Sequence, residues 1–509
     1  MLARIHGFGI NGIEAYPVTI EVDVARGLPS MQIVGLPDSA IRESKERVRS
    51  AIKNAGFDFP CGRITVNLSP ADTKKEGPAF DLPIAFGILA AAEKIVFPEL
   101  ARFAFLGELS LSGKILPAAG ALPAALACAN RALRGLIVPQ GNSKESALAG
   151  TVPIFPFGSL TEAVNFLTEP NDTRAFQPAP EEATESLEEQ LDLAEVKGQT
   201  HAKRGLEVAA AGGHNILLIG PPGGGKTMLA RRMPTILPPM AMEEALEVTR
   251  IYSVSRTCGR ALDTLARERP LRSPHHTASH IALVGGGTDP KPGEVTLAHN
   301  GILFLDELPE FSRRTLESLR QPMEDHFVTV ARAARTLRFP SRFMLVAAMN
   351  PCPCGHLMNS GRKCRCAPAD IARYMGRISG PLLERIDLHL QVPALTAREL
   401  SSAPDGESSA VVRERTAKAR ARQSERFKHS KVFANAQMAS GHLKKFCALA
   451  PEGRRLLNEA IDTLGLSARV HDKLLKIART ISDLAGSENI RVEHLAEAIG
   501  YRCLDKTSI

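Results

Sequence analysis

The segment from Gly220 to Thr227 contains the residues best suited to phosphate chemistry. It fits the pattern G-x-x-x-x-G-K-[ST], follows an apolar run at 215–219 and precedes a helical pattern. Glycine N–H groups can curl around phosphates, Lys226 can reach the β- and γ-phosphate oxygens, and the Thr227 hydroxyl can bind Mg²⁺. The sequence therefore predicts an ATP and Mg²⁺ site formed by Gly220, Pro221, Pro222, Gly223, Gly224, Gly225, Lys226 and Thr227.

Two further apolar runs end in polar residues that suit hydrolysis. Asp306 and Glu307 follow the run at 302–305, and Asn350 follows the run at 343–348. Asp306 is suited to hold Mg²⁺ through water, and Glu307 is suited to orient or deprotonate the attacking water. The amide of Asn350 can hydrogen-bond both that water and the γ-phosphate, although an Asn before a proline is also a common turn former.

Four cysteines lie within fifteen positions, at Cys352, Cys354, Cys364 and Cys366. Two close pairs of thiolates on a short loop suit tetrahedral Zn²⁺, which closes a loop too small to bury a core. With four cysteine ligands the site would be structural rather than catalytic. His356 could replace one sulfur, and an iron–sulfur cluster or four free thiols are the alternatives. Basic residues that could touch phosphates surround the cluster, namely Arg362, Lys363, Arg365 and Arg373.

Three segments concentrate features suited to contacts with a substrate. Strand patterns at 327–330 and 336–339 flank a connector at 331–335 and predict an arginine-rich hairpin, whose alternative is a solvated hairpin. The segment 271–295 contains four glycines and three histidines, and we expect it to contact substrate rather than a metal. The segment 411–431 carries eight Lys/Arg against two Glu and is typical of a solvated helix face, with contact to nucleic acid as the alternative.

These residues require a parallel sheet to position them, and the chain provides the pattern for one. From about 191 to 392, strands alternate with helices, which predicts a parallel sheet with helices on both faces. We expect the zinc-binding insertion at 351–367 within this domain. Residues 393–509 are predominantly helical and predict a lid.

The first part of the chain predicts a separate α/β domain over residues 1–168. Residues 18–24 and 64–68 alternate as strands do, and a helical pattern lies at 40–55. Residues 82–92 are apolar and predict a buried helix. Residues 169–190 are rich in Glu, Pro, Thr and Ala and predict a linker.

Length and composition set the class of protein. A chain of 509 residues with 44% hydrophobic and 23% charged residues is typical of a globular protein with several domains. No stretch reaches the roughly 18 to 20 apolar residues that span a bilayer, and the N-terminus lacks a signal-peptide pattern. We therefore expect a cytoplasmic protein with no membrane partner. The net charge of +8, with no Trp and four Tyr, favours a partner contacted through its phosphates over one contacted through base stacking.

The order of these motifs resembles the AAA+ superfamily, within it the magnesium-chelatase-like clade, and in particular the ComM/YifB family of competence-related ATPases. The similarity extends over essentially the whole chain. The residues that carry it, besides the phosphate-binding loop, are Gly198-Gln199, Gly212-Gly213-His214-Asn215, Asn300 to Glu307, Ser379 to Asp387 and Leu466-Ser467-Ala468-Arg469.

The resemblance implies roles for residues that spacing alone does not assign. Arg385 matches the arginine finger that enters the neighbouring subunit's site, and Arg469 matches the second sensor arginine of the lid. Each could instead be a surface arginine paired with a neighbouring acid. A finger implies a ring, here a homo-hexamer. The hairpin would point into its central pore, and the residues expected to contact DNA are Arg332, Arg335, Arg338 and Lys291.

The first domain resembles the proteolytic domain of Lon, which has the ribosomal S5 domain 2-like fold. Lon's nucleophilic serine falls at Ala79 here, and its lysine falls near Leu122-Pro123-Ala124. Acyl transfer requires both the hydroxyl and the base, so the resemblance implies a retained fold without peptidase activity.

The family resemblance implies a hexameric motor that moves on single-stranded or branched DNA. Its substrates would include recombinase-bound intermediates, during transformation or repair. The alternatives are a chelatase-like motor that remodels a protein partner, and an unfoldase.

Overall fold

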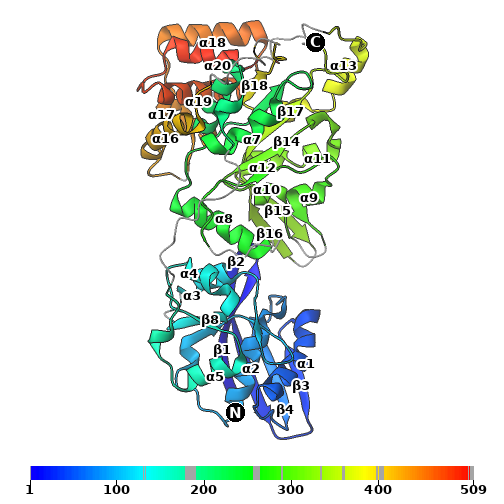
Figure 1. Cartoon of the computed structure of the whole chain (residues 1–509), viewed down its shortest axis with the longest axis vertical. Coiled ribbons are helices and arrows are strands. Elements are labelled where there is room, and N and C mark those ends of the chain that lie inside the picture. The colour runs from blue at the N-terminus through cyan, green and yellow to red at the C-terminus, as the bar shows by residue number, and fades with distance from the viewer. Residues whose placement is uncertain are drawn as a thin grey trace. The chain divides into compact units, whose positions relative to one another are not determined.

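The computed structural model describes residues 2–129, 131, 133–177, 191–255, 264–287, 291–332, 335–357, 362–396, 399, 406–430, 432–502 and 504. The chain divides into two compact units (Figure 1). The first contains Met1–Glu185 and Ala245–Ala266, and the second contains Ser186–Glu244 and Arg267–Ile509. Of the expected linker, residues 178–190 lie outside the described residues.

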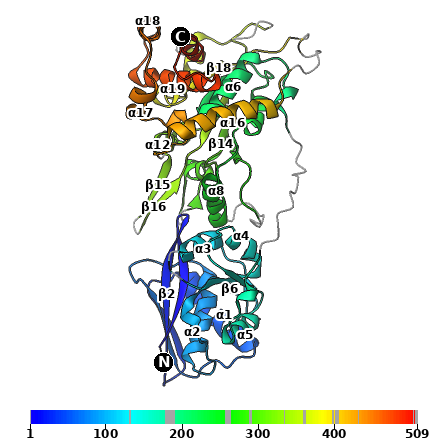
Figure 2. The same ribbon diagram turned by 90° about the vertical axis from the view of Figure 1, so that its left-hand side faces the viewer.

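A mixed seven-stranded sheet organises the first unit, in the order β3-β4-β2-β1-β5-β8-β9. β1 and β2 form a long antiparallel ribbon, β4 pairs antiparallel with β2, and the remaining neighbours pair in parallel (Figure 2). The strands are β1 (Leu2–Asn11), β2 (Glu14–Ala25), β3 (Ser30–Val34), β4 (Arg63–Ser69), β5 (Phe103–Phe105), β8 (Gly135–Pro139) and β9 (Ile154–Phe157), with a small pair β6 (Glu108–Leu109) and β7 (Ile115–Leu116).

The helices of the first unit follow their sequence patterns. Asp38 caps α1 by accepting a hydrogen bond from the Ile41 N–H at 2.8 Å, which satisfies an otherwise unpaired donor. α2 is buried almost all round, as its continuous apolar sequence predicts. The helices are α1 (Ser39–Asn54), α2 (Asp81–Ala91), α3 (Ala121–Ala129), α4 (Ser143–Ala147) and α5 (Leu160–Thr168).

The second unit contains a five-stranded parallel sheet in the order β11-β14-β17-β10-β18. Both faces are covered: Ile216 and Leu218 of β10 face one buried cluster, while Leu217 and Ile219 face another. Such continuous apolar strands are the pattern expected of a buried parallel sheet. The strands are β10 (Ile216–Ile219), β11 (Leu271–Arg272), β14 (Ile302–Leu305), β17 (Met344–Met349) and β18 (Leu388–Gln391).

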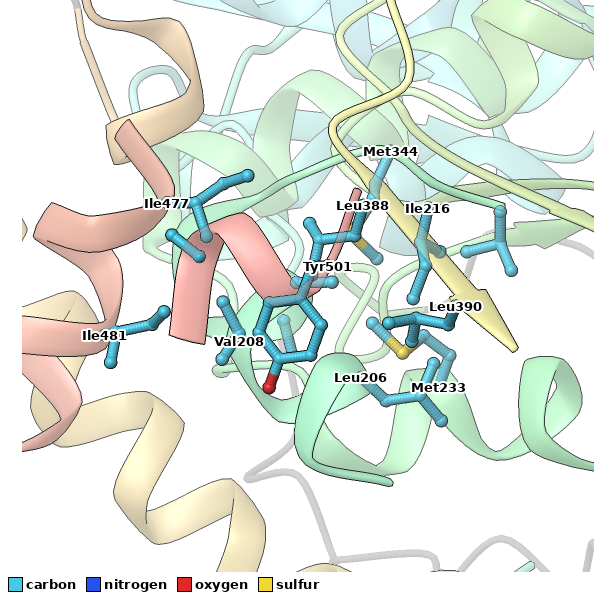
Figure 3. Packing of buried hydrophobic residues seen from close by; sticks show 14 of the residues in the cluster. Leu206, Val208, Ile216, Met233, Met344, Leu388, Leu390, Ile477, Ile481 and Tyr501 are labelled. Carbon is cyan, nitrogen blue, oxygen red and sulfur yellow. The ribbon is translucent and has the colours of Figure 1, made fainter. Parts of the chain in front are cut away.

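Helices α6 and α7 join the C-terminal helices in one core with the first face of this sheet. Figure 3 shows Ile477 and Ile481 of α19 near Val208 of α6, and Leu388 and Leu390 of β18 contribute to the same cluster. The helices are α6 (Thr200–Gly212), α7 (Lys226–Ile236), α16 (Ser409–Arg426), α17 (Ser440–Phe446), α18 (Pro451–Leu464), α19 (Ala468–Leu484) and α20 (Val492–Gly500).

Shorter elements cover the second face and connect the strands. α8 (Met242–Ser255) follows α7, and from Ala245 onward its residues group with the first unit. The others are α9 (His280–Val284), α10 (Glu294–Leu297), α11 (Arg313–Glu317), α12 (Arg320–Asp325), α13 (Pro368–Met375) and α14 (Gly380–Leu383), with the hairpins β12 (Gly285–Gly286)–β13 (Lys291–Pro292) and β15 (Phe327–Arg332)–β16 (Arg335–Pro340).

The interpretation of 411–431 as a solvated face holds for only one side of α16. The other side packs against α6 and α19 (Figure 2), and several of its arginines make structural contacts. Arg420 is partly buried and donates to the carbonyl oxygens of Ala210 and Ala211 at the C-terminal end of α6. Arg426 pairs with the buried Asp483 carboxylate at 2.5 Å. Partners that lie more than 50 residues away in the sequence satisfy these charges.

The α/β fold class that the sequence predicts is confirmed: a mixed-sheet first domain, a parallel-sheet P-loop domain and a helical C-terminal region. Among the described residues, no helix is long and apolar enough to cross a membrane.

Candidate functional site

The phosphate-binding loop lies between the end of β10 and the start of α7. Lys226, the first residue of α7, donates hydrogen bonds to the carbonyl oxygens of Gly220 at 2.7 Å and Pro221 at 2.9 Å. Its Nζ also lies 3.1 Å from Oδ1 of Asn350 at the end of β17. Burial lowers the pKa of Lys226, while the negative charge of Asp306 opposes that shift. The lysine, the amide and the loop therefore meet at one point.

The phosphate-binding loop is open beside some of its glycines and closely packed beside another. A Cβ at Gly223 or Gly225, both with positive φ, would meet nothing within 4 Å, whereas a Cβ at Gly220 would lie 2.0 Å from the Val392 carbonyl oxygen. The open side, at the N-terminus of α7, fits the phosphates of a nucleotide. Oγ1 of Thr227 donates to Oδ2 of Asp306 at 2.7 Å, so the two oxygens that suit Mg²⁺ are already adjacent.

Glu307 lies beside these groups in a left-handed backbone conformation, with φ of 52°. Its N–H donates to Oδ1 of Asp306 at 2.9 Å. Its Oε2 lies 3.5 Å from Nδ1 of His276.

Sequence reasoning missed the contact between His276 and Glu307. We expected the histidines of 271–295 to contact substrate, yet His276 faces Glu307. A signal was available, because His276 follows β11, and β11 and β14 are parallel neighbours whose carboxyl ends share one edge of the sheet. Gln199, which carries the family resemblance but had no role assigned, donates its amide to the carbonyl oxygens of Gly224 at 3.2 Å and Pro393 at 2.7 Å and so ties the loop to the chain beyond β18.

The four cysteines converge in space. Sγ of Cys352 lies 3.4 Å from Sγ of Cys354 and 3.6 Å from Sγ of Cys364, and all four ligand atoms lie within 4.8 Å of one another. Sulfurs that bind one tetrahedral Zn²⁺ lie about 3.8 Å apart, so the group fits this metal. Backbone N–H groups of Arg365 and His356 lower the pKa of Cys354 to about 6, which favours the thiolate. Within the described part of the chain, the metal-binding group consists of the cysteines without His356.

The cysteine loop packs against the phosphate-binding loop. A Cβ at Gly355 would lie 2.5 Å from Cδ of Pro222, so the two loops are in close contact at this glycine. Cys352 also follows Asn350 by only two residues. A metal bound by the cysteines would therefore stabilise the segment that positions Asn350.

The two arginines assigned by resemblance are both engaged within the single chain. Arg385 follows α14 and pairs with Glu324 of α12 at 2.5 Å, while its other terminal nitrogen donates to the Pro381 carbonyl oxygen. Arg469 at the start of α19 lies 3.5 Å from Glu384.

A buried polar cluster joins the segment of Arg385 to the helix of Arg469. Asp387 accepts a hydrogen bond from the Asn215 N–H at 3.0 Å and pairs with Lys473 of α19 at 2.5 Å. The Lys473 charge and the His214 imidazole hold the pKa of Asp387 far below its usual range despite burial, so the pair is ionic. Lys473 lies one helical turn beyond Arg469, on the same side of α19.

The arginine-rich hairpin and the insertion between β11 and β14 lie side by side. A Cβ at Gly286 of β12 would lie 4.0 Å from Cγ1 of Val330 in β15, and β12 also contacts α9, which Figure 1 labels near β15. Lys291 is exposed, and Arg338 is exposed with Cζ 3.4 Å from the centroid of the Phe327 ring. Arg332 and Arg335 face each other as the last paired residues of β15 and β16, and their side chains lie outside the described structure.

In the first unit, Ala79, the residue expected to match Lon's serine, lies in the 3₁₀ turn Pro78–Phe80 before α2. Leu122 and Ala124 are buried apolar residues of α3. Neither position carries a hydroxyl or an amine.

The parallel sheet and the groups at its carboxyl edge define a class of protein, the AAA+ P-loop ATPases. The profile described as "Magnesium chelatase, subunit ChlI" matches residues 192–400. Related profiles for the ChlI subunit and for its C-terminal part match residues 20–142 and 406–502.

Relatives extend this similarity over the whole chain. The competence protein ComM of Haemophilus influenzae is 45% identical over 99% of this chain and 98% of its own length. YifB of Escherichia coli is 44% identical over 100% of this chain and 98% of its own length. The chain belongs to the ComM/YifB family of magnesium-chelatase-like AAA+ ATPases, as the sequence motifs predict. A Lon protease of Trichlorobacter lovleyi is 23% identical over 32% of this chain and 21% of the protease, in the N-terminal region.

Proposed function

We propose that this chain is an ATP-driven DNA motor that works as a homo-hexamer on single-stranded or branched recombination intermediates. The observation that carries the proposal is the adjacency of the β15–β16 hairpin to the β12–β13 hairpin, on which Arg338 and Lys291 are exposed. Arg332 and Arg335 are the last paired backbone positions of β15 and β16. Basic groups concentrated on two neighbouring loops suit the phosphates of a nucleic-acid strand. The similarity to a protein named for competence, the uptake of DNA, supports the same substrate.

In this proposal the site divides the work of hydrolysis among its residues. Thr227 and Asp306 hold Mg²⁺, which would neutralise charge on the phosphates. Lys226 leaves the loop carbonyl groups and contacts the β- and γ-phosphates. Glu307 orients or deprotonates the attacking water, and Asn350 hydrogen-bonds it. Arg385 enters the neighbouring subunit's site and Arg469 contacts the chain's own nucleotide.

In this proposal the four cysteines hold a structural Zn²⁺. The proposal also assigns the protein to the cytoplasm. Reduced thiols, ATP and DNA are all present there. Transformation and general repair both provide the branched DNA that the motor would act on.

The test measures ATP hydrolysis with and without single-stranded and forked DNA at one stated salt concentration. We expect DNA to stimulate the wild type and to have little effect on Arg332→Ala/Arg335→Ala. Lys226→Ala should be inactive throughout. Arg454→Ala/Arg455→Ala, which removes two exposed arginines from α18, is the matched control and should respond as the wild type does.

No stimulation of the wild type by any DNA at low salt would contradict the DNA motor and leave the ATPase in place. The second candidate is then a chelatase-like or unfoldase-like motor that remodels a protein. The match to chelatase subunit profiles favours this candidate over other rivals. Stimulation by unfolded polypeptide instead of DNA would support it.

A further inference from the structure

The motif Gly212-Gly213-His214-Asn215 joins the end of α6 to β10, the strand that leads into the phosphate-binding loop. Gly213 caps α6 in a left-handed conformation with φ of 69°. A Cβ at Gly212 would lie 2.2 Å from Nε2 of His214, so a glycine here leaves room for the ring. The two glycines therefore place His214 and Asn215 directly before β10.

Asn215 contacts the main chain of the segment that contains Arg385. Its Nδ2 donates to the Arg385 carbonyl oxygen at 3.2 Å, and its backbone N–H donates to Oδ2 of Asp387 at 3.0 Å. Its carbonyl oxygen accepts from the N–H groups of Asp387 at 2.9 Å and Leu388 at 3.0 Å. Its Oδ1 accepts from the N–H of Leu345 in β17 at 2.8 Å. Asn215 thus joins β10, β17 and the segment of Arg385.

The two side-chain contacts require both halves of the Asn215 amide. The Leu345 N–H can only donate, so the amide oxygen must face it. The Arg385 carbonyl oxygen can only accept, so the NH₂ group must face that oxygen. An aspartate at this position would satisfy the first group and repel the second.

The C-terminal part of the chain holds the same segment through other groups. Nη1 of the buried Arg502 donates to the Ile386 carbonyl oxygen at 2.8 Å. The His214 ring shares a hydrogen bond of 2.8 Å with Oγ1 of Thr480 in α19. The main chain at 385–387 is therefore fixed by its surroundings.

The Arg385 side chain has contacts of a different kind. Its guanidinium pairs with Glu324, whose side chain is half exposed, and donates to the Pro381 carbonyl oxygen. Rotation about the side-chain torsions of Arg385 would exchange these partners for a phosphate without moving its main chain. The position of that main chain therefore decides where the guanidinium can reach.

We propose that Asn215 is a positioning residue that fixes the main chain of Arg385 relative to β10. It thereby couples the arginine offered to a neighbouring subunit to the phosphate-binding loop of its own subunit. The action of Arg385 in the neighbouring site rests on the proposed function, whereas the restraint on its main chain does not.

The first test measures kcat and KM for ATP in Asn215→Asp and in Asn215→Ala, which removes the amide without adding a charge. We expect kcat to fall about 10- to 100-fold, the effect of displacing a catalytic group by about 1 Å, and KM to change little. Asn142→Asp is the matched control, because Asn142 also bridges an N–H and a carbonyl group, both of Ala118 in the first unit. An unchanged kcat in the Asn215 variants would overturn the proposal.

Mixed rings decide which site Asn215 serves. Glu307→Gln keeps its arginine and loses its own site, whereas Arg385→Ala does the reverse. Asn215→Asp should regain activity when co-assembled with Glu307→Gln and should regain none with Arg385→Ala. The opposite pattern would show that Asn215 serves only its own phosphate-binding loop and would overturn the proposal.

Hydrogen exchange tests the restraint itself, without a ring or catalysis. Both Asn215 variants should exchange the amides of 384–388 faster than the wild type and Asn142→Asp do. Unchanged exchange there would contradict the restraint. If Arg385→Ala and Glu307→Gln fail to complement each other while exchange at 384–388 still rises, the action between subunits falls and the restraint by Asn215 stands.

Discussion

Substitution of Lys226 and substitution of Glu307 should have different effects on the binding and hydrolysis of ATP. Lys226 points into the loop that would hold the phosphates, whereas Glu307 lies beyond it at the end of β14. We expect Glu307→Gln to bind ATP normally and to lose on the order of 10²- to 10⁴-fold in hydrolysis, the contribution of a general base. Lys226→Ala should lose binding as well.

Titration with a fluorescent ATP analogue and a steady-state hydrolysis assay separate these two effects. Equal loss of binding in both variants would contradict the assignment of Glu307 to the chemical step.

At the scale of single residues, the sequence predicted the residues of the phosphate-binding loop, because the phosphates themselves dictate their spacing. It could not predict that His276 contacts Glu307, since that contact depends on which strands are neighbours in the sheet. The arginines of α16 show the same limit. Arg420 and Arg426 appear solvated in the sequence, and only the fold brings the carbonyl groups of α6 and the carboxylate of Asp483 to them.

Among the elements, the cysteine loop should affect nucleotide binding although no cysteine contacts the nucleotide site in the described structure. The close approach of Gly355 to Pro222 makes this loop a support of the phosphate-binding loop. We expect Cys364→Ser/Cys366→Ser, or removal of zinc by a chelator, to weaken binding of the ATP analogue severalfold. Cys61→Ser, at an exposed cysteine of the first unit, is the control.

The zinc content of each protein, measured by elemental mass spectrometry, should be determined alongside that titration. A protein that contains no zinc as purified, or a double variant that binds the analogue as tightly as the wild type does, would contradict the structural zinc.

The buried pair of Asp387 and Lys473 joins β18 to α19 and should be sensitive to the loss of one partner. Lys473→Met leaves the buried Asp387 carboxylate without its lysine partner, which costs on the order of 3–5 kcal/mol. In Asp387→Asn/Lys473→Met no charge remains, and we expect much of that loss to be recovered. Thermal unfolding of the full chain measures both variants. A double variant no more stable than Lys473→Met would contradict the pairing.

The elements themselves were largely predictable. Strands at 302–305 and 327–340 and helices at 39–54 and 226–236 follow from apolar periodicity and from turn or cap residues. The boundaries of the elements were less predictable. β15 ends at Arg332 and β16 begins at Arg335, both beyond the expected strand ends, because backbone pairing across the hairpin continues past the apolar residues.

At the scale of the whole molecule, the proposed ring would make the site of one subunit depend on Arg385 of the next. Arg385→Ala and Glu307→Gln should each be inactive alone. Co-assembled in equal amounts they should regain roughly a quarter of the wild-type rate, because that fraction of interfaces combines an intact glutamate with an intact arginine. No recovery in co-assembled rings would contradict a finger that acts between subunits.

The claim that the molecule is a DNA motor is tested most directly by unwinding of a labelled forked DNA in the presence of ATP. We expect the wild type to separate the strands, and Glu307→Gln and Arg332→Ala/Arg335→Ala to fail, while Arg454→Ala/Arg455→Ala acts as the wild type does. Strand separation by the wild type that persists in the hairpin variant would remove the hairpin from the account. A wild type that hydrolyses ATP on the fork without moving either strand would contradict the motor itself.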